Sequence, residues 1–418
     1  MDPSLLPVSL SFGIFLLCCW FYLSRNRRRV PLPPGPRGFP LVGSLWNAPV
    51  EYPWVTYAQW TATYGDVLYL DIPGNPTVVI NSAQAAVNLL EKRSGNYSDR
   101  PDFTMIQLAG WDFNLGFMRY SEQWRMHRRM FHQYFQLRAV PEYYPAQMKA
   151  TSVLLQQIYS GSVIMKTVYG YDVNADDDKF VELADRAQES ASEGWFPGAS
   201  FLGLADTWRK DILSVVLSTI LVFLLHPEIQ TKVQAELDAV VGYTRLPNFE
   251  DRLQLPYIEA ILLEALRWNP VLPLGVAHRS LKDDVYRGYY IPADYLESPH
   301  LDAQCRAILH DERDYPNPMV FDPDRFMPGD GKQLQPNPTA AFGFRRRCDM
   351  SWPLFRAWIA IASMASTLSF SKAVDSEGSV IEPSATFTDG LLSFPAPFKC
   401  TIKARSAEAQ AVINSGGL

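Results

Sequence analysis

The amino-acid sequence predicts a mainly α-helical protein with minor β structure and one transmembrane helix at its N-terminus. An uncharged apolar stretch of membrane-spanning length stands near the start, at residues 5–23. Only residues 66–80 alternate apolar and turn-forming residues as a hairpin of two short strands does, and further strand character lies at residues 387–403. Segments of helical length are more numerous. We expect helices at residues 83–93, 121–135, 179–192, 211–225, 229–241 and 255–268.

The size and composition indicate a folded globular protein with a large core. The chain has 418 residues, of which 47% are hydrophobic and 13% aromatic, and this length can form two or three domains or one large helical domain. A net charge of -6 provides no basic field, so we expect no nucleic-acid partner. The five cysteines are few and unpatterned, which argues against a disulfide scaffold and suits a reducing compartment.

The N-terminal region is predicted to be a membrane anchor. A helix over residues 5–23 spans about 30 Å, which is enough for one bilayer crossing. Four arginines follow within residues 25–29, and by the positive-inside rule they hold the C-terminal side in the cytoplasm. The alternative, a cleaved signal peptide, carries its positive charge before the apolar stretch. We expect residues 1–30 to be a retained anchor with its basic stop, and the proline-rich residues 31–45 to form a stiff hinge that holds the rest of the chain against the membrane.

Residues 211–225 are also strongly apolar and leave two interpretations open. The segment has only about 15 residues and begins with the acidic Asp211, which favours a buried core helix over a membrane crossing. A second membrane span is the alternative.

A series of motifs in the second half of the chain carries a family resemblance. Their spacing of three places Glu264 and Arg267 on one face of a helix, where they can pair. Alone, such a pair would be an ordinary surface salt bridge, but further motifs follow it. They are WNP (268–270), VLPLGVAHR (271–279), DDVYRGYYIP (283–292), AILHD (307–311) and FDPDRF (321–326). This ordered series resembles the second half of a cytochrome P-450 and is similar to fungal microsomal members of the O-methylsterigmatocystin oxidoreductase kind.

The resemblance implies a cytochrome P-450 fold, incomplete in this chain, over residues 46–405, with a tail at residues 406–418. In this family the paired Glu264 and Arg267 also contact the arginine of the Pro-x-Arg-Phe segment, here Arg325. That triad is structural and holds the loop beneath the heme. Heme b is the implied cofactor, and iron and porphyrin carry out the oxidation.

The resemblance also implies which residues contact the heme. Trp124 and Arg128 match the family's Trp-x-x-x-Arg helix and lie one turn apart, so that both can bind one propionate. The alternative is an exposed basic helix that contacts acidic lipid or a reductase. Arg279 matches the arginine that reaches the other propionate, and Arg346 lies in the ligand loop. Cys348 is the candidate for the metal ligand, the thiolate that binds iron, and its alternative is an ordinary buried cysteine.

The ligand loop itself departs from the family pattern. The family has Phe-Gly-x-Gly-x-Arg-x-Cys-x-Gly, in which the glycines let backbone N–H groups approach the sulfur. Here Phe342 stands six residues before Cys348 instead of seven, Arg345 replaces the second glycine, and Met350 replaces the last one. A DNA sequence that encodes a typical continuation of the family's loop in one reading frame encodes Met350 to Arg356 when translation begins two bases later. A local frame slip is therefore an alternative, in which Cys348 only stands near the ancestral ligand position.

Two further stretches depart from the family. Residues 293–305 are polar where the family has an apolar strand and its turn. The chain is also several dozen residues short before Asp211, which indicates an internal deletion near residues 210–211 in the oxygen-activating helix. Asp206 and Thr207 imitate the acid and alcohol of that helix, which relay protons to bound oxygen. Their surroundings favour the end of an earlier loop, so they are only candidates for the catalytic role.

The resemblance implies a single-pass protein of the endoplasmic-reticulum membrane with a cytoplasmic catalytic domain. It would take electrons from an NADPH-cytochrome reductase and hydroxylate a lipophilic small molecule in fungal secondary metabolism or xenobiotic oxidation. The alternative is a catalytically inactive, membrane-anchored relic or a mis-predicted gene product of the same family. Asn96 begins a glycosylation sequon, but a cytoplasmic domain does not meet the glycosylation machinery, so we expect it to stay unmodified.

Overall fold

A computed structural model describes most of the chain that follows the predicted anchor. The described residues are 30–40, 42–108, 115–135, 138–169, 204–293, 300–329, 333–344, 351–375 and 377–415. The predicted transmembrane helix at residues 5–23 and the predicted helix at residues 179–192 lie outside them. Within the described ranges no single helix is long and apolar enough to cross a membrane, and one sharply bent pair, Ile212–Leu225 with Pro227–Val240, meets that criterion of length and composition only as a pair.

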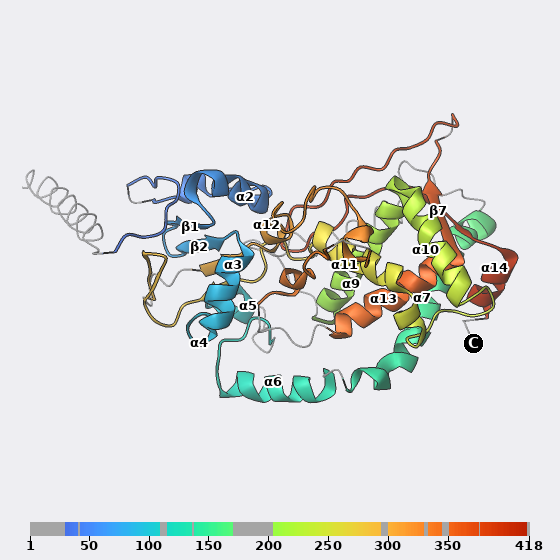
Figure 1. The fold of residues 1–418 in the computed structure, drawn as a ribbon, viewed down its shortest axis with the longest axis horizontal. Helices are drawn as coiled ribbons and strands as arrows, with labels where there is room; N and C mark the ends of the chain where they lie inside the picture. Colours follow the sequence, from blue (N-terminus) through green and yellow to red (C-terminus); the bar gives the residue numbers. More distant parts are fainter. Residues whose placement is uncertain are drawn as a thin grey trace, which may run out of the picture.

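The helical part of the molecule is built around α13 (Ser351–Thr367). This helix packs against α7 (Tyr144–Tyr169), α9 (Leu204–Leu225), α10 (Pro227–Val240) and α11 (Pro256–Trp268), as Figure 1 shows. Every side chain from Ala357 to Ala365 is buried, which places this part of the helix at the centre of the core. The buried apolar residues of α13 are Ala357, Trp358, Ile359, Ala360, Ile361, Ala362, Met364 and Ala365.

The other helices are mostly short. Proline is the first residue of α2 (Pro53–Tyr64), α10 and α11, a position at which the backbone N–H has no partner within the helix. The helices predicted at residues 83–93, 121–135, 229–241 and 255–268 are confirmed, the first as α3 continued by η2. The remaining elements are η1 (Leu45–Asn47), α2 (Pro53–Tyr64), α3 (Ala83–Ala86), η2 (Val87–Lys92), α4 (Ser94–Tyr97), α5 (Thr104–Leu108), α6 (Glu122–Phe135), η3 (Val140–Tyr143), η5 (Asp251–Gln254), α12 (Cys305–Leu309), η6 (Pro323–Phe326), η7 (Thr339–Phe342) and α14 (Ala407–Asn414).

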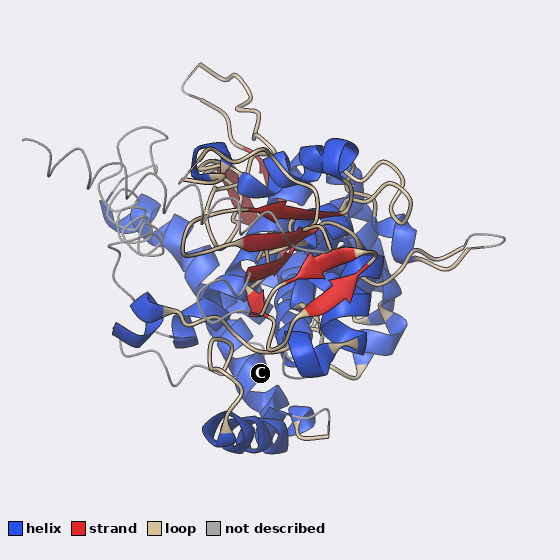
Figure 2. Cartoon of the chain, turned by 90° about the vertical axis from the view of Figure 1, so that its left-hand side faces the viewer, coloured by secondary structure: helices blue, strands red, loops and turns tan. Residues whose placement is uncertain are grey.

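The β structure is minor, as predicted, and is divided among small sheets (Figure 2). The predicted hairpin is present, since β1 (Val67–Leu70) and β2 (Thr77–Ile80) pair antiparallel. β2 also pairs in parallel with β6 (His300–Ala303), and β6 pairs with β3 (His278–Arg279), so the order is β1-β2-β6-β3. The two remaining pairs are β4 (Asp284–Tyr286) with β5 (Tyr289–Ile291), and β7 (Leu368–Lys372) with β8 (Cys400–Ala404).

The packing of α9 distinguishes the two interpretations of the apolar residues 211–225, a buried core helix and a second membrane span. Leu221, Val222 and Phe223 are 0% exposed, and α9 packs against α10, α11 and α13. The segment is therefore the buried core helix that its length and acidic start indicated. The same helix begins at Leu204, so Asp206 and Thr207 lie in its first turns. Placing them at the end of a loop was wrong, because the leucine and alanine that precede them favour helix and continue α9 upstream.

Two other segments have a regular conformation in the structure. Residues 293–305 are polar and unlike the apolar strand of the family, yet they contain β6, which is hydrogen-bonded on both sides. The alternation of the pleat turns Leu301 and Ala303 into the core, 0% and 5% exposed. The predicted tail, residues 406–418, contains α14. The side chain of Ser406 caps that helix, and Ile413 is only 1% exposed, so α14 packs on the core.

Strand β6 places the titratable side chain of Asp302 in apolar surroundings. Asp302 lies opposite Val79 of β2, on the face where Val79 clusters with Tyr57, Leu68 and Leu70. Burial raises the pKa of Asp302 to about 7. Burial first and the charge of Asp302 second raise the pKa of Tyr57.

We predict that Asp302 makes the fold less stable as the pH rises from about 4 to about 7. An unfolded aspartate has a pKa of about 3.9, so in this range the unfolded chain has released the proton that the folded chain retains. Asp302→Asn should remove this dependence and raise the free energy of unfolding near neutral pH by about 2–4 kcal/mol. Urea denaturation across this pH range measures the effect. The exposed Glu312→Gln should change nothing, and identical pH profiles for wild type and Asp302→Asn would contradict the prediction.

Candidate functional site

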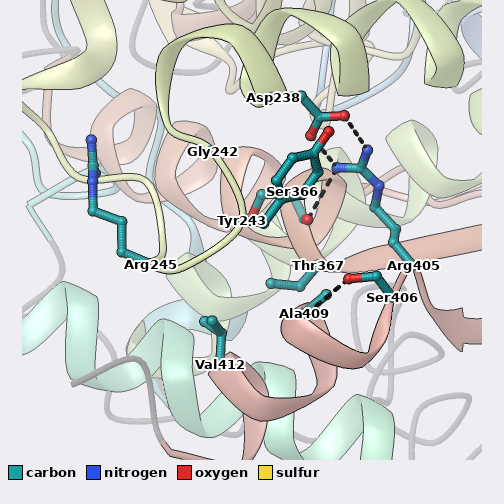
Figure 3. Close-up of a pocket in the computed structure, with 10 residues that line it drawn as sticks. All are labelled: Asp238, Gly242, Tyr243, Arg245, Ser366, Thr367, Arg405, Ser406, Ala409 and Val412. Atoms are coloured by element: carbon teal, nitrogen blue, oxygen red, sulfur yellow. Dashed lines mark hydrogen bonds and ion pairs between the residues drawn. The ribbon is translucent and has the colours of Figure 1, made fainter.

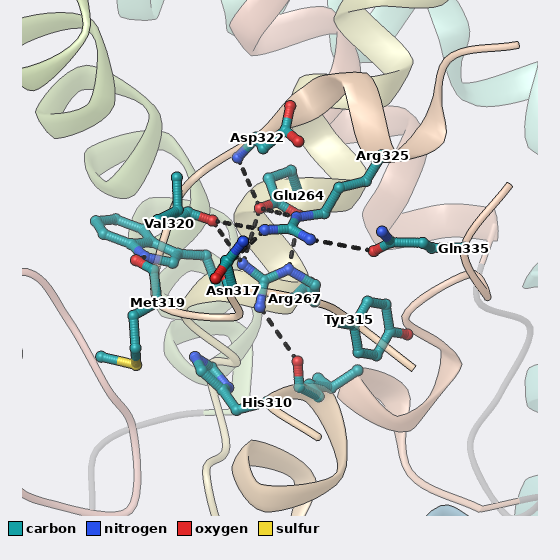
Figure 4. A network of polar contacts seen from close by, with 12 residues as sticks. Glu264, Arg267, His310, Tyr315, Asn317, Met319, Val320, Asp322, Arg325 and Gln335 are labelled. Atoms are coloured by element: carbon teal, nitrogen blue, oxygen red, sulfur yellow. Dashed lines mark hydrogen bonds and ion pairs between the residues drawn. The ribbon is translucent and has the colours of Figure 1, made fainter. Parts of the chain in front are cut away.

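A buried carboxylate joins two arginines at the centre of the first candidate site (Figure 4). Glu264 and Arg267 lie on one face of α11, and Arg267 Nε and Nη2 donate to the two Glu264 oxygens at 2.7 and 2.8 Å. Arg325 of η6 donates from Nε to Glu264 Oε1 at 3.3 Å. The side chains of Glu264 and Arg267 are 0% exposed, and that of Arg325 is 4% exposed. The structure brings together the three residues that the resemblance assigns to a triad.

Backbone groups satisfy the other hydrogen-bonding atoms of this network. Arg325 Nη2 donates to Asn317 O at 2.8 Å, and Arg267 Nη1 donates to the last carbonyl of α12 at 3.2 Å. The Asp322 N–H donates to Glu264 Oε1 at 2.9 Å. Burial raises the pKa of Glu264, and its bonds to Arg267 and to the Asp322 N–H oppose that shift. Because a charge is buried only when it is paired and hydrogen-bonded, the network fixes the loops on both sides of η6 against α11.

A second charged cluster surrounds Arg279 of β3. Arg279 Nη1 lies 3.4 Å from Asp102 Oδ2, and each Asp102 oxygen accepts from Arg119 Nη1 at 3.1 Å. Arg119 Nε lies 3.6 Å from Asp99 Oδ2. The backbone oxygen of Asp99 accepts the Arg279 N–H at 2.9 Å, so the four residues form a closed ring of contacts. We call these four residues the Arg279 ring.

Trp124 is connected to the Arg279 ring through Tyr120. The Tyr120 N–H donates to Asp99 Oδ1 at 2.8 Å, and the Tyr120 and Trp124 ring centroids are 5.3 Å apart. Trp124 and Arg128 are half-buried on α6, one turn apart. Figure 1 shows α6 along the lower edge of the molecule, away from α9 and α11. Trp124 therefore belongs to the same region as Arg279, and Arg128 follows it one turn further along α6.

The remaining candidates fall where the structure gives no side chains. Cys348 and Arg346 lie outside the described residues, between Phe344 and the start of α13. Asp206 and Thr207 are placed as parts of α9, but their side chains are not described. The iron-ligand and proton-relay assignments therefore stay predictions from the sequence.

Sequence reasoning missed Asp99, Asp102 and Arg119. The string Asp-Arg-Pro-Asp at residues 99–102 was visible, but nothing in its spacing indicates a partner near residue 279. The ring exists only because β3, the segment after α4 and the segment before α6 meet in the fold. A signal confined to one segment could not have revealed it.

The donors around Arg279 fit a ligand that carries carboxylates. The Arg279 ring contains two guanidiniums and two carboxylates. The neighbouring Arg100 adds a third guanidinium, whose donors reach the carbonyls of Val276 and Ala277 next to β3 at 2.7 and 2.8 Å. Guanidinium is the side-chain group best suited to bind carboxylates, so the described residues fit the propionate side of a heme.

A separate pocket of about 120 Å³ lies between α10, α13 and α14 (Figure 3). Its charged groups are already paired, since Arg405 donates to the two oxygens of Asp238 at 3.0 and 2.8 Å. Ser406 Oγ accepts the Ala409 N–H at 3.1 Å, which caps α14. None of the predicted site residues lines it, so it is not a candidate for the catalytic site. The other lining residues are Gly242, Tyr243, Arg245, Ser366, Thr367 and Val412.

The amide of the sequon residue Asn96 is used within the fold. Asn96 Nδ2 donates to Lys282 O at 2.9 Å. Asn96 Oδ1 accepts the N–H groups of Leu281 and Lys282 at 3.1 and 2.7 Å. The side chain therefore fastens α4 to the turn between β3 and β4, and a glycan on this nitrogen would disrupt that attachment.

We predict that Glu264→Gln lowers the free energy of unfolding by about 3–5 kcal/mol, because it leaves two buried guanidiniums without their counter-charge. Urea denaturation measures this loss. Glu122→Gln is the matched control, since Glu122 and Arg125 form the same i,i+3 pair on α6 but are 78% and 52% exposed. It should cost less than about 0.5 kcal/mol. Equal losses in the two variants would contradict a role for burial.

We predict that Asn96→Gln lowers the free energy of unfolding by about 1–2 kcal/mol, because the longer side chain cannot keep these hydrogen bonds. Ser98→Ala destroys the sequon but leaves the amide in place, and it should be as stable as wild type. Endoglycosidase treatment should leave the gel mobility of all three proteins unchanged. A wild-type mobility shift that Ser98→Ala abolishes would overturn this reading of Asn96.

Comparison with known proteins gives matches along nearly the whole chain. The family model described as "Cytochrome P450" matches residues 33–163 and 211–348. Cytochrome P450 monooxygenase 208 of Postia placenta is 33% identical, over 99% of both chains. Tryptamine 4-monooxygenase of Psilocybe cyanescens is 32% identical, over 96% of this chain and 98% of the relative. Cytochrome P450 monooxygenase 98 of Postia placenta is 32% identical, over 96% of each chain.

The matches are interrupted. The alignment with the first of these relatives spans 510 positions whereas this chain has 418 residues, so at least 92 positions have no counterpart here. The family model leaves residues 164–210 unmatched, while the exact place of the predicted deletion near residues 210–211 stays a prediction. The extent of the matched sequence and its identity to these relatives establish that the chain belongs to the cytochrome P450 family.

Proposed function

We propose that this chain is a heme-thiolate monooxygenase that hydroxylates a lipophilic small molecule. The observation that carries the proposal is the buried network of Glu264, Arg267 and Arg325, which is complete in its hydrogen bonds. The charged groups of this network are buried away from water, so the network cannot bind a partner at the protein surface. Because the chain belongs to the cytochrome P450 family, we infer that this network holds a heme-binding loop in position.

The residues that would hold heme b have distinct tasks. Arg279 and Arg346, with Trp124 and Arg128 of α6, would bind the propionates through charge-assisted hydrogen bonds. Cys348 would supply the thiolate ligand of the iron. When bound, the heme supplies the oxygen-activating chemistry, which a protein side chain cannot perform. Asp206 and Thr207 are the candidates for moving a proton toward the reacting oxygen.

The cellular setting is part of the proposal. An apolar segment at residues 5–23 followed by arginines supports a single-pass anchor in the endoplasmic-reticulum membrane with the catalytic domain in the cytoplasm. Electrons would come from an NADPH-cytochrome reductase. Fungal relatives named monooxygenases, one of them acting on tryptamine, support a small-molecule substrate in secondary metabolism or xenobiotic oxidation. Fold alone does not specify the substrate.

A second candidate function is that of an inactive relic. Arg345 and Met350 stand where the ligand loop of the family has glycines, and side chains at these positions hinder the approach of backbone N–H groups to the sulfur. The unmatched alignment positions favour the same candidate. Such a chain would bind heme weakly or not at all, whether it is a true relic or a mis-predicted gene product.

We predict that the reduced chain, expressed in membranes, gives a carbon monoxide difference spectrum with the red-shifted band of thiolate ligation. Cys348→Ala should abolish that band. Cys400→Ala is the matched control, because Cys400 is a half-buried thiol on β8 whose pKa is raised to about 11 by burial, and it should keep the band.

Each other outcome has a defined meaning. A band typical of non-thiolate ligation, or no band, would support the relic and contradict the monooxygenase. A thiolate band that survives in Cys348→Ala would move the ligand to another cysteine and contradict the assignment of Cys348.

A further inference from the structure

Three polar side chains lie on one face of the sheet, where two neighbouring strands end. β2 and β6 pair in parallel, with Ile80 opposite Ala303. The Gln304 N–H donates to Ile80 O at 2.9 Å, which continues this pairing past the ends of the strands. Because side chains alternate along a strand, Asn81, Asp302 and Gln304 share the face opposite to that of Ile80 and Ala303. We call these three residues the oxygen cluster.

The amide nitrogens of Asn81 and Gln304 both point to α2, which packs over this face. Asn81 Nδ2 donates to Tyr57 O and to Thr61 Oγ1, each at 2.8 Å. Gln304 Nε2 donates to Trp54 O at 3.0 Å. These partners fix the orientation of both amides, because a reversed amide would place its oxygen against a carbonyl oxygen. Asn81 Oδ1 and Gln304 Oε1 therefore point to the other side of each amide.

The two amide oxygens are buried and have no hydrogen-bond donor within the described residues. Asn81 is 5% exposed and Gln304 is 0% exposed, and a buried acceptor without a donor is destabilising. Asp302 adds a carboxyl group whose pKa is raised to about 7 by burial. The oxygen cluster thus combines acceptors that need a donor or a positive charge.

The ligand that suits these oxygens is a positive ion of low charge. Hard cations bind carboxylate and amide oxygens, and carbonyl oxygens can replace the hydration shell of K⁺. The single carboxylate of Asp302 balances one positive charge. Within the described ranges, no three carboxylate, histidine or cysteine side chains come together, which disfavours a divalent ion. Asp302 is half-buried, so the oxygen cluster is not sealed from solvent.

We propose that the oxygen cluster binds an alkali-metal ion, K⁺ or Na⁺, between α2 and the sheet. Asp302 supplies the counter-charge, and the amide oxygens of Asn81 and Gln304 supply further ligands, with water in the remaining positions. Because α2 orients both amides, the ion binds only while α2 is docked on the sheet, and it therefore stabilises α2. The pH dependence predicted for Asp302 then applies to buffers without this ion. The inference is independent of the heme, since none of the three residues is a candidate heme contact.

The test is amide hydrogen exchange of the full-length chain in detergent at about pH 8, where the carboxyl group of Asp302 is ionised. KCl or NaCl replaces tetramethylammonium chloride at a constant ionic strength of about 0.2 M. We expect exchange of the α2 amides to slow along a saturable curve, by about five- to twentyfold at the highest concentration. Helix α14, which packs against α7, α13 and β8, is the internal reference and should not respond.

Three variants separate ion binding from general effects of salt. Asp302→Asn should abolish the dependence on K⁺ and Na⁺ and remain folded, because it removes a buried charge. Gln304→Met removes one amide oxygen at similar side-chain length and should raise the half-saturating concentration about two- to tenfold. Glu312→Gln removes an exposed carboxylate and should respond as wild type does, which excludes an effect of net charge.

Three outcomes would overturn the inference. An equal response in wild type and Asp302→Asn would show a general effect of salt. No response of α2 to either ion would leave buried water as the partner of the two amide oxygens. A larger response to Ca²⁺ or Mg²⁺ than to K⁺ and Na⁺ would contradict the assignment to an alkali-metal ion.

Discussion

The carboxylate of Glu264 is the point on which the arrangement of the candidate site depends. It accepts from Arg267, from Arg325 and from the Asp322 N–H, in surroundings without exposed surface. A charge at such a place is tolerable only while all of its partners remain. The position of α11 and the paths of the loops around η6 are therefore not independent, because movement of one leaves charges of the other uncompensated. Helices α13 and α9 pack against α11, so their positions also depend on the hydrogen bonds of Glu264.

Much of this arrangement could be predicted from local sequence, and the remainder could not for physical reasons. The Glu264 and Arg267 pair was visible because helical spacing puts the two residues on one face. Arg325 entered only by resemblance, since its contact with Glu264 crosses between distant segments. The Arg279 ring was not predicted, because its two carboxylates meet their arginines only after three segments assemble. The local sequence predicted helices within α9, α10 and α11. The burial of α9 confirms the core helix that its short length and acidic start favoured over a membrane span.

In two segments the tertiary structure outweighs what the local sequence pattern indicates. Residues 293–305 have the composition of a loop, but β2 and β3 supply hydrogen bonds on both edges of β6 and impose the strand. As a result, the strand places one carboxyl group, that of Asp302, beside the apolar Val79 and the ring of Tyr57. In the C-terminal residues 406–418, Val412 and Ile413 supply an apolar face to α14, which packs against α7, α13 and β8. The sequence of a single segment does not indicate which other elements the segment will pack against.

The docking of α14 has a consequence for how the protein is made. Gln156 of α7 donates to Ile413 O, an interaction that joins residues 257 positions apart. Helix α14 thus covers helices that are synthesised earlier, including α13, the centre of the core. The helical part cannot finish folding before α14 has been synthesised. Until then the apolar surfaces of α7 and α13 that α14 covers remain exposed, and a chain that lacks α14 would leave them exposed permanently.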